Sequence, residues 1–415
     1  MASTVVGTPA VERVNFTHLV FDVAWFGLAL AATTRFLTPY AIRLDATSQQ
    51  LALMAALPGI ALLVATSLAI WWRRLFNSTV KSLFWPGLGQ RLVFLLPAMT
   101  PLFPREWQPY WLILAATLPN IPTGISGAIF NMMLREAISQ ERMNSLLSQR
   151  SLALNLALAA GTLAFGFLLQ SLAFPTNYPL IFLIAFAFAL ISQVHVISVR
   201  VVFPASLPAP QRQEMRKSVW FSREFLPVAL VAFLVHVGFF TLISITPMHL
   251  MRSLNADEAY ITLFGLVELG SGAVIALFTG TIMRRMGASG LIVGSMLGLA
   301  LAAVIFGVGQ NLTLMLIGAV LSGASWSAAG IVGIYAIMYE RVPQEQTSQW
   351  AMAHLQAIAL GVFVGPLLGD ALINLDINLP LVILLCGGIR LLVGIFTHFL
   401  LVPRSTTREV LPVEA

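Results

Sequence analysis

Ionisable side chains inside long apolar stretches are the residues of this sequence best placed to do chemistry. Glu268 lies well inside the apolar stretch Glu258–Met283, and no basic residue lies within one helical turn of it in the sequence. Burying a charge away from water is costly unless a partner compensates it. Glu268 is therefore a candidate for binding a proton or a cation, and the alternative is a structural ion pair with an arginine elsewhere, such as Arg390 or Arg91. Asp22 is a second candidate for the same chemistry, with a solvated position at the foot of its helix as the alternative.

Motifs of enzymes and of ATP-driven pumps are absent from the sequence. It contains no H-E-x-x-H zinc motif, no G-x-S-x-G nucleophile motif and no G-x-x-x-x-G-K-[ST] phosphate-binding loop. The 6 histidines lack metal-ligand spacing, and the single cysteine, Cys386, excludes an internal disulfide and a multi-cysteine metal site. We therefore expect no enzymatic activity, no cofactor and no metal, and any active transport would draw on an ion or solute gradient.

The elements that position these residues are long apolar segments. Of the 415 residues, 58% are hydrophobic and 10% are charged, whereas a soluble protein has about 25% charged residues. A helix needs roughly 20 apolar residues to cross a bilayer, and segments of about that length recur along the whole chain. The sequence predicts an all-α membrane protein with 12 transmembrane helices at His18–Tyr40, Gln50–Trp72, Leu83–Phe103, Pro109–Met133, Ser151–Leu172, Tyr178–Arg200, Phe225–Met251, Glu258–Met283, Ser289–Val308, Leu312–Tyr339, Ala351–Ile373 and Asn378–Val402.

Basic residues fall mainly on one side of these segments. With a cytoplasmic N-terminus, the cytoplasmic stretches hold 17 of the 23 Lys and Arg residues, and the outer loops hold only Arg43, Arg105 and Arg252. This asymmetry predicts that both termini are cytoplasmic and that the positive charge contacts anionic lipid rather than nucleic acid. The predicted parts are a cytoplasmic tail (1–17), a six-helix half (18–200), a cytoplasmic linker (201–224), a second six-helix half (225–402) and a cytoplasmic tail (403–415).

The two halves also share short sequence matches in the same order. Such an internal repeat of six-helix halves places a substrate site between the halves, near the middle of the membrane. The matches are Thr38-Pro39 with Thr246-Pro247, Leu44-Asp45-Ala46 with Leu254-Asn255-Ala256, Gly59 with Gly270, Arg73-Arg74 with Arg284-Arg285, and the pattern E-x-[IV]-x-Q-E that begins at Glu136 and at Glu340.

Over residues 15–403 the chain resembles the major facilitator superfamily. That family carries the signature G-x-x-x-D-R-x-G-[RK]-[RK] after span two and again after span eight. The second copy here, Gly280–Gly287, keeps both glycines and an arginine, with Arg284 at the acidic position, whereas the first copy keeps only Arg74. Leu44-Asp45-Ala46-Thr47 is similar to the L-G-A-S that often follows span one. The resemblance implies alternating-access transport of small solutes, often coupled to a proton or another ion.

The resemblance further implies which spans line the solute cavity. In the family these are spans one, four, seven and ten, and here they carry amides, hydroxyls and aromatic rings that suit an amphipathic solute. Hydrogen bonding between helices is the alternative for each residue, and Arg35 could instead extend to the membrane interface. Arg91 and Arg390 lie on spans that are peripheral in the family, where a structural ion pair is expected. The candidate cavity residues are Arg35, Asn120, Asn131, His236, Thr241, Ser244, Trp326 and Tyr335.

Two more sets of residues follow from the same resemblance. The spans that form the seam between halves in the family carry small residues that let helices approach closely, here Gly59, Gly161, Gly272, Gly361, Gly365 and Gly369. The signature loops are candidate gates because arginine replaces the family's aspartate. When the cytoplasmic side is closed, we expect Arg73 and Arg74 to pair with Glu136 or Glu141, and Arg284 and Arg285, in the loop bounded by Gly280 and Gly287, to pair with Glu340 or Glu345. The alternative is that these arginines only fix the topology.

The sequence thus favours a secondary transporter in a bacterial plasma membrane. We expect it to export a small, amphipathic solute, to couple that export to protons and to work as a monomer. An uptake permease for a sugar, peptide or organic anion is one alternative. A sensor, scaffold or lipid scramblase that moves no soluble solute is another. The expected partners are the solute, protons or another coupling ion, and membrane lipids.

Overall fold

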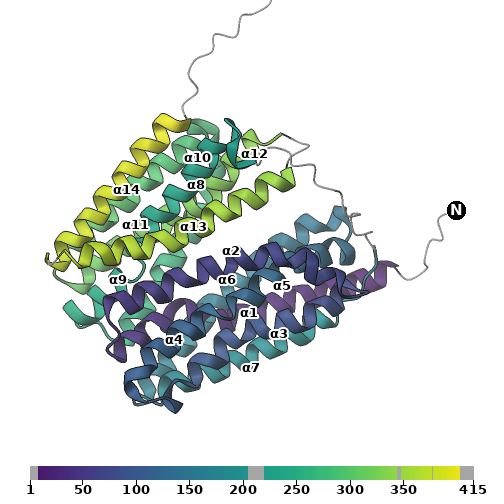
Figure 1. Cartoon of the computed structure of the whole chain (residues 1–415), viewed down its shortest axis with the longest axis horizontal. Coiled ribbons are helices and arrows are strands. Elements are labelled where there is room, and N and C mark those ends of the chain that lie inside the picture. Colours follow the sequence, from purple (N-terminus) through teal and green to yellow (C-terminus); the bar gives the residue numbers. More distant parts are fainter. Residues whose placement is uncertain (1–7, 204–218, 344–346, 376, 402–415) are drawn as a thin grey trace, which may run out of the picture.

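The computed structural model describes residues 8–203, 219–343, 347–375 and 377–401, and every regular element in them is a helix (Figure 1). Helices suit the apolar segments because each backbone polar group is satisfied within its own segment. The elements are α1 (Thr8–Arg43), α2 (Ser48–Arg74), α3 (Thr79–Ala98), η1 (Thr100–Leu102), η2 (Arg105–Trp107), α4 (Gln108–Thr117), α5 (Asn120–Ala137), α6 (Gln140–Ser171), α7 (Asn177–Ile197), η3 (Val219–Phe221), α8 (Phe225–Phe240), α9 (Ile245–Met248), η4 (His249–Ser253), α10 (Glu258–Val308), α11 (Leu312–Trp326), η5 (Ser327–Gly333), α12 (Ile334–Arg341), α13 (Thr347–Ile373) and α14 (Leu379–Leu401).

Ten helical stretches of the described residues are long and apolar enough to cross a membrane. The longest, α10, contains two of the predicted segments, and its direction reverses at Gly287, where φ is 71° and ψ is 171°. The Tyr260 hydroxyl near the start of α10 donates to the carbonyl of Leu312, just beyond its end, so the two arms lie side by side. With α3 as the remaining helix, the predicted all-α architecture of 12 spans is confirmed.

Several spans are interrupted where the backbone departs from a regular α-helix. A break at Pro119 separates α4 from α5, and π-helical turns occupy His249–Ser253 and Ser327–Gly333. These interruptions fall in the fourth, seventh and tenth predicted segments. Local departures of this kind free backbone groups and are common at functional sites. The same three segments were expected to line a solute cavity.

The turns that follow the first and seventh spans have the same unusual backbone. Asp45 and Asn255 have φ of 63° and 53°, a left-handed conformation in which Asp and Asn are enriched among non-glycine residues. The amide of Ala46 then donates back to the carbonyl of Ala41, and the amide of Ala256 donates back to that of Leu250. The sequence match at these positions therefore reflects a structural repeat.

The two halves, residues 8–200 and 225–401, pack together at one end and separate at the other (Figure 1). The largest buried apolar cluster mixes residues of both halves, such as Tyr40 and Leu51 with Leu250 and Ile261. Two other clusters each belong to a single half. We call the joined end, at which α1 ends, the closed end. The other, at which α1 and α13 begin, is the open end.

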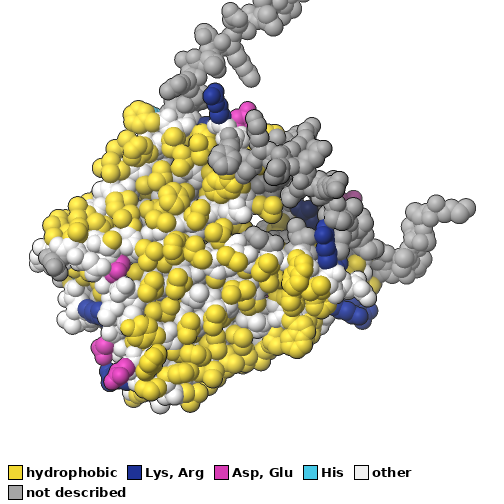
Figure 2. Space-filling model, in the orientation of Figure 1, with side chains coloured by type: hydrophobic (Ala, Val, Ile, Leu, Met, Phe, Trp, Pro, Cys, Tyr) yellow, Lys and Arg dark blue, Asp and Glu magenta, His cyan; other side chains and the backbone are white. Residues whose placement is uncertain are grey.

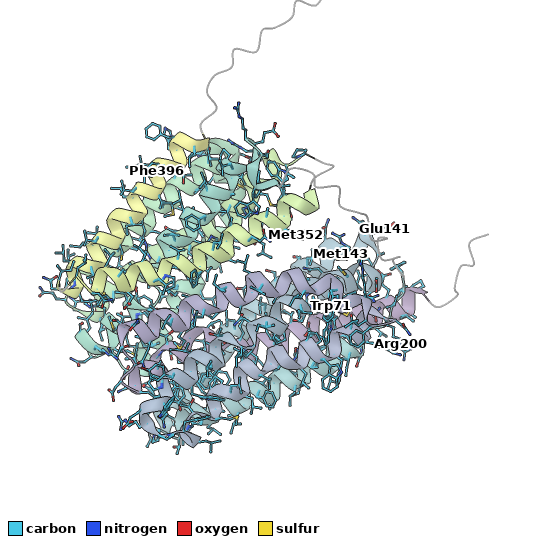
Figure 3. All side chains as sticks on the ribbon, in the orientation of Figure 1. Trp71, Glu141, Met143, Arg200, Met352 and Phe396 are labelled. Carbon is cyan, nitrogen blue, oxygen red and sulfur yellow. The ribbon has the colours of Figure 1, made fainter. Side chains whose placement is uncertain are left out.

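Large side chains of both halves are exposed at the open end. Trp71 on α2 is 61% exposed and Met352 on α13 is 56% exposed, and Figure 3 labels one on each half. Nearer the closed end the same two helices touch, because a Cβ added to Gly59 would lie 2.9 Å from the carbonyl of Ala359. The basic residues predict that the open end faces the cytoplasm.

The outer surface of the bundle is largely apolar. In Figure 2 hydrophobic side chains cover most of the visible face, and charged side chains gather toward its ends. Leu277, Phe399 and Phe167 are among the most exposed large hydrophobic residues. An apolar belt of this kind suits contact with lipid.

The described residues cover the predicted domain boundaries only in part. Helix α1 already begins at Thr8, within the predicted tail 1–17. Most of the predicted linker (204–218) and the whole predicted C-terminal tail (403–415) lie outside the described residues. The amides of Val202 and Phe203, at the start of the linker, donate to the carbonyl of Glu136. The division into tail, half, linker, half and tail stays a prediction.

Candidate functional site

Glu268 forms an ion pair with Arg35 across the two halves. The Arg35 Nη1 atom lies 3.2 Å from Glu268 Oε2, and both side chains are about one-fifth exposed, at 21% and 22%. The Ser322 hydroxyl on α11 donates to Glu268 Oε1 at 3.0 Å. Gly265 leaves room for the arginine, because a Cβ there would lie 2.9 Å from Arg35 Cδ. The partner of Glu268 is thus Arg35 rather than Arg390 or Arg91, and Arg35 pairs with it instead of extending to the interface.

A second ionic cluster joins the halves at the closed end. Arg43, at the end of α1, donates to both carboxylate oxygens of Glu258, at the start of α10, at 2.7 and 2.8 Å. The Tyr178 hydroxyl on α7 donates to the same carboxylate at 3.1 Å, and its ring stacks on Tyr40 with centroids 4.6 Å apart. Two-point contacts between arginine and carboxylate are among the stronger polar interactions in proteins.

Two more hydrogen bonds reinforce the closed end. The Arg252 guanidinium donates to the carbonyl of Ala46 at 2.6 Å, and the Ser244 hydroxyl donates to the carbonyl of Leu51 at 3.1 Å. Ser244 was predicted to face a solute cavity, but it holds α9 against α2. We call the contacts made by Arg43, Glu258, Tyr178, Arg252 and Ser244 the closed-end lock.

Asp22 is buried within the first half and is fully engaged. Its Oδ2 atom lies 3.1 Å from Nη1 of Arg150, and its Oδ1 accepts a hydrogen bond from the Ser192 hydroxyl at 2.8 Å. Asp22 is 5% exposed, so it is not a solvated helix foot. The two predicted coupling carboxylates therefore belong to different clusters.

Arg91 and Arg390 do not form the expected ion pairs among the described residues. Arg91 donates to the carbonyls of Ala189 and Gly87 and to the Ser192 hydroxyl. Arg390 donates to the carbonyls of Gly238, Phe239 and Leu299. Each guanidinium therefore joins neighbouring helices through backbone oxygens, which a five-donor side chain can do without a carboxylate.

Of the remaining cavity candidates, the structure brings together His236 and Trp326. Their rings meet edge to face at 5.2 Å, and Trp326 also stacks on Phe239 at 3.8 Å. Asn120 and Thr241 hydrogen-bond to carbonyls of their own chain segments, those of Ala116 and Gly238. Asn131 is exposed, and Tyr335 is 39% exposed with its ring near His354.

The predicted gate arginines are not paired with carboxylates in the described part of the chain. Arg73 is buried and donates to the Thr79 hydroxyl and to the Phe76 carbonyl, which closes its own loop. Arg284 donates to the hydroxyl of Thr281. Arg74, Arg285, Glu141 and Glu340 are exposed, Glu136 is buried, and Glu345 lies outside the described residues. The two halves are separated at the open end in this structure. Pairing of these arginines with the carboxylates in a state closed at that end therefore stays a prediction.

Only one of the predicted seam glycines, Gly59, lies between the halves. Gly161 packs α6 on α1, and Gly272 packs α10 on the α11–η5 segment. Gly361, Gly365 and Gly369 pack α13 on the α8 segment, and a Cβ at Gly361 would lie 2.6 Å from the carbonyl of Phe233. The signature glycine Gly280 has no close neighbour, whereas Gly287 makes the reversal of α10. Small residues thus mainly tighten each half.

Comparison with known proteins agrees with this architecture. Residues 228–415 match the family model described as Major Facilitator Superfamily. No curated protein matches the sequence. Among solved structures, a mutant of the nucleoside transporter NupG covers 94% of this chain and 100% of its own, with a TM-score of 0.73 at 9% identity.

Two further structures have the same fold. A bacterial homologue of the human lysosomal transporter Spinster, in an inward-facing and occupied conformation, has a TM-score of 0.69 at 13% identity, with 93% of this chain and 96% of that chain covered. The inward-open xylose transporter XylE from E. coli has a TM-score of 0.67 at 14% identity, with 96% of both chains covered. At these identities the likeness concerns the fold.

Proposed function

Because the chain belongs to the major facilitator superfamily, we propose that it exports a small amphipathic solute by alternating access and couples that export to protons. Its family and its fold neighbours are transporters, so the chain is a multi-pass membrane transporter and not an enzyme. The direction, the coupling ion and the solute class are the proposed part.

The observation that carries the proposal is the Arg35–Glu268 ion pair, which joins the two halves near their contact. A solute carrier of two halves works by rocking one half against the other around a site between them. A charged pair across that boundary has to stretch or break when the halves move. The pair can therefore set the relative free energies of the two states.

Protonation of Glu268 offers a direct link between a proton and this movement. A neutral carboxyl group keeps the hydrogen bond to Ser322 but loses its attraction to the guanidinium of Arg35. A hydrogen bond to a charged group contributes about 1.5–3 kcal/mol, which is enough to shift a two-state population by roughly tenfold or more. Protonation would thus favour release of the closed end.

The preference for an amphipathic solute comes from the aromatic cluster on α8 and α11. His236, Phe239 and Trp326 combine flat apolar surfaces with few polar atoms. Such a surface suits a partly apolar compound better than a highly charged one. The predicted orientation places the open end, and so the access route in this state, on the cytoplasmic side, as an exporter requires for loading.

The experiment begins with purified protein and a thermal-shift screen of a solute library to find a ligand. That ligand is then followed in reconstituted vesicles, with and without a pH gradient. Glu268→Gln should abolish gradient-driven movement but leave exchange of labelled for unlabelled solute intact, because exchange needs no net proton transfer. Glu106→Gln, at an exposed carboxylate in η2, serves as the matched control. Unchanged gradient-driven transport in Glu268→Gln would remove the coupling role.

A further inference from the structure

A cavity lies among helices α1, α3, α5, α6 and α7 of the first half, and its volume is about 160 Å³. Helices α1 and α5 belong to the first and fourth predicted spans, which are predicted to line the solute cavity. A pocket that encloses a drug-sized ligand has about 300–1,000 Å³. The cavity therefore has room for one end of an amphipathic solute that moves along this path.

The charged side chains in the cavity wall leave a net positive charge. Arg91 and Arg150 line the cavity, and Asp22 is the only carboxylate among its described lining residues. Asp22 Oδ2 lies 3.1 Å from Arg150 Nη1, whereas all three guanidinium nitrogens of Arg91 donate to neutral oxygens. A charge inside a membrane-spanning bundle is costly unless an opposite charge compensates it. The wall therefore favours a solute with one negative charge.

Arg150 has donors that such a solute can reach. Its hydrogen bonds, to the carbonyl of Leu19 and to Asp22, both start from Nη1. Nε and Nη2 donate to no described residue, and both keep accessible surface, as does the side chain as a whole, which is 14% exposed. Neighbouring N–H groups of a planar guanidinium suit the two oxygens of a carboxylate. The unused side of Arg150 is thus a site for a carboxylate.

The rest of the cavity wall suits an apolar group. Phe26, Leu83 and Phe130 line it, and Arg150 Cζ lies 4.8 Å from the centroid of the Phe130 ring. Gly127 leaves open space in the α5 wall, because it is exposed and an added Cβ there would meet no atom within 4 Å. An apolar ring attached to a carboxylate can therefore enter the cavity with it.

We propose that this cavity binds the carboxylate end of the transported solute, which is therefore an organic monoanion with an apolar body. Arg150 binds the carboxylate oxygens through Nε and Nη2, and Phe26 and Phe130 contact the apolar part. Arg150 thereby distinguishes an acid from a neutral compound of the same shape. This inference rests on the proposed function, because it names the class of the solute that is moved.

The test measures equilibrium binding of radiolabelled benzoate and of benzamide to the full-length protein in lipid nanodiscs. The two compounds share a flat ring and a planar head group, but only benzoate is an anion at neutral pH. Benzoate should bind, and benzamide should bind roughly tenfold more weakly, because hydrogen bonds between charged groups are the stronger ones. Equal binding of the two compounds, or no binding of benzoate, would overturn the proposal.

Charge variants assign the preference to Arg150. Arg150→Gln should abolish the preference for benzoate, and Arg135→Gln, at an exposed arginine of α5, is the matched control and should keep it. Asp22→Asn keeps an acceptor for the Ser192 hydroxyl but removes the negative charge that competes for Arg150. It should therefore strengthen benzoate binding several-fold and leave benzamide unchanged. Unchanged or weaker benzoate binding in Asp22→Asn would contradict the proposal, even where Arg150→Gln fails to fold.

Shape variants assign the binding to the cavity. Gly127→Leu places a side chain in the open space of the α5 wall and should weaken the binding of both compounds. Gly294→Leu, in α10, also meets no atom within 4 Å at its Cβ and should weaken neither. Equal effects of the two substitutions would place the binding outside the cavity.

Transport in reconstituted vesicles separates this inference from the proposed function. Proton-driven movement of a neutral solute that Arg150→Gln leaves unchanged would overturn the monoanion and keep the proposed function. Benzoate binding that depends on Arg150, without proton-driven movement of benzoate, would support the carboxylate site and count against proton-coupled export.

Discussion

Arg35 on α1 and Glu268 on α10 lie 233 positions apart in the sequence, yet Arg35 Nη1 and Glu268 Oε2 are 3.2 Å apart in the structure. One residue belongs to each half of the molecule. Ser322 binds the other oxygen of the same carboxylate. The pair therefore senses the relative position of the halves, while the serine keeps the carboxylate attached to its own half.

The first prediction concerns the energy of this pair. A double-mutant cycle of Arg35→Gln and Glu268→Gln should give a coupling free energy of about 1 kcal/mol or more, since both groups are mostly buried. The same cycle on Arg105 and Asp45, whose side chains are 72% and 78% exposed, should give about 0–1 kcal/mol, toward the low end. Reversible unfolding of the variants in detergent gives both coupling free energies. Equal coupling in the two cycles would show that Arg35 and Glu268 form an ordinary surface pair.

The second prediction concerns the closed-end lock. Glu258→Gln removes the charge that holds Arg43 in two-point contact and should open this end. The opening can be followed with a cysteine at position 52, because Ala52 is buried at the closed end, in a Cys386→Ser background. The rate at which a membrane-impermeant maleimide modifies this cysteine should rise several-fold in Glu258→Gln. Tyr178→Phe removes only one hydrogen bond and should have a smaller effect. Protection unchanged by Glu258→Gln would argue against a lock.

The third prediction concerns the open end. Arg284→Glu should stabilise the state that is open at this end, because the opposite charge is needed to approach Glu340 when the end closes. Adding Glu340→Arg should partly restore closure. Accessibility of a cysteine at Met352, again without Cys386, measures the balance. If the double variant is no closer to the unaltered protein than the single one, these charges do not form a gate.

The fourth prediction concerns packing inside the second half. Gly361→Ala places a methyl group 2.6 Å from the carbonyl of Phe233 and should destabilise the protein by about 1–3 kcal/mol. Gly388→Ala, in α14, meets no atom within 4 Å and should be neutral or slightly stabilising, because alanine favours the helix. Thermal unfolding in detergent compares them. Similar melting temperatures would show that α13 does not need the close approach at Gly361.

The sequence predicted the number of spans and the repeat because both depend on local properties. Apolar length identifies a crossing helix, and the Leu-Asp-Ala and Leu-Asn-Ala turns are recognisable as equivalent positions. Both proved to hold a left-handed residue, at Asp45 and Asn255. Glu268 was found for the same reason, since a carboxylate inside an apolar segment is visible without any structure.

Partners could not be predicted in the same way, because the rotation of each helix about its axis is set by packing. Arg35 was therefore not identified as the partner of Glu268, and Arg390 proved to bind only backbone oxygens. The sequence did contain one unused signal for the closed-end lock. Arg43 and Glu258 carry opposite charges beside the two equivalent turns, where the repeat brings helix ends together.

The most direct measurement is the distance between spin labels at Trp71→Cys and Met352→Cys, which lie on opposite sides of the open end, in a Cys386→Ser background. If the Arg35–Glu268 pair stabilises the state open at this end, Glu268→Gln should move the distance distribution toward shorter values, and Glu106→Gln should leave it unchanged. Identical distributions for Glu268→Gln and the labelled parent protein would contradict the role of this ion pair in alternating access.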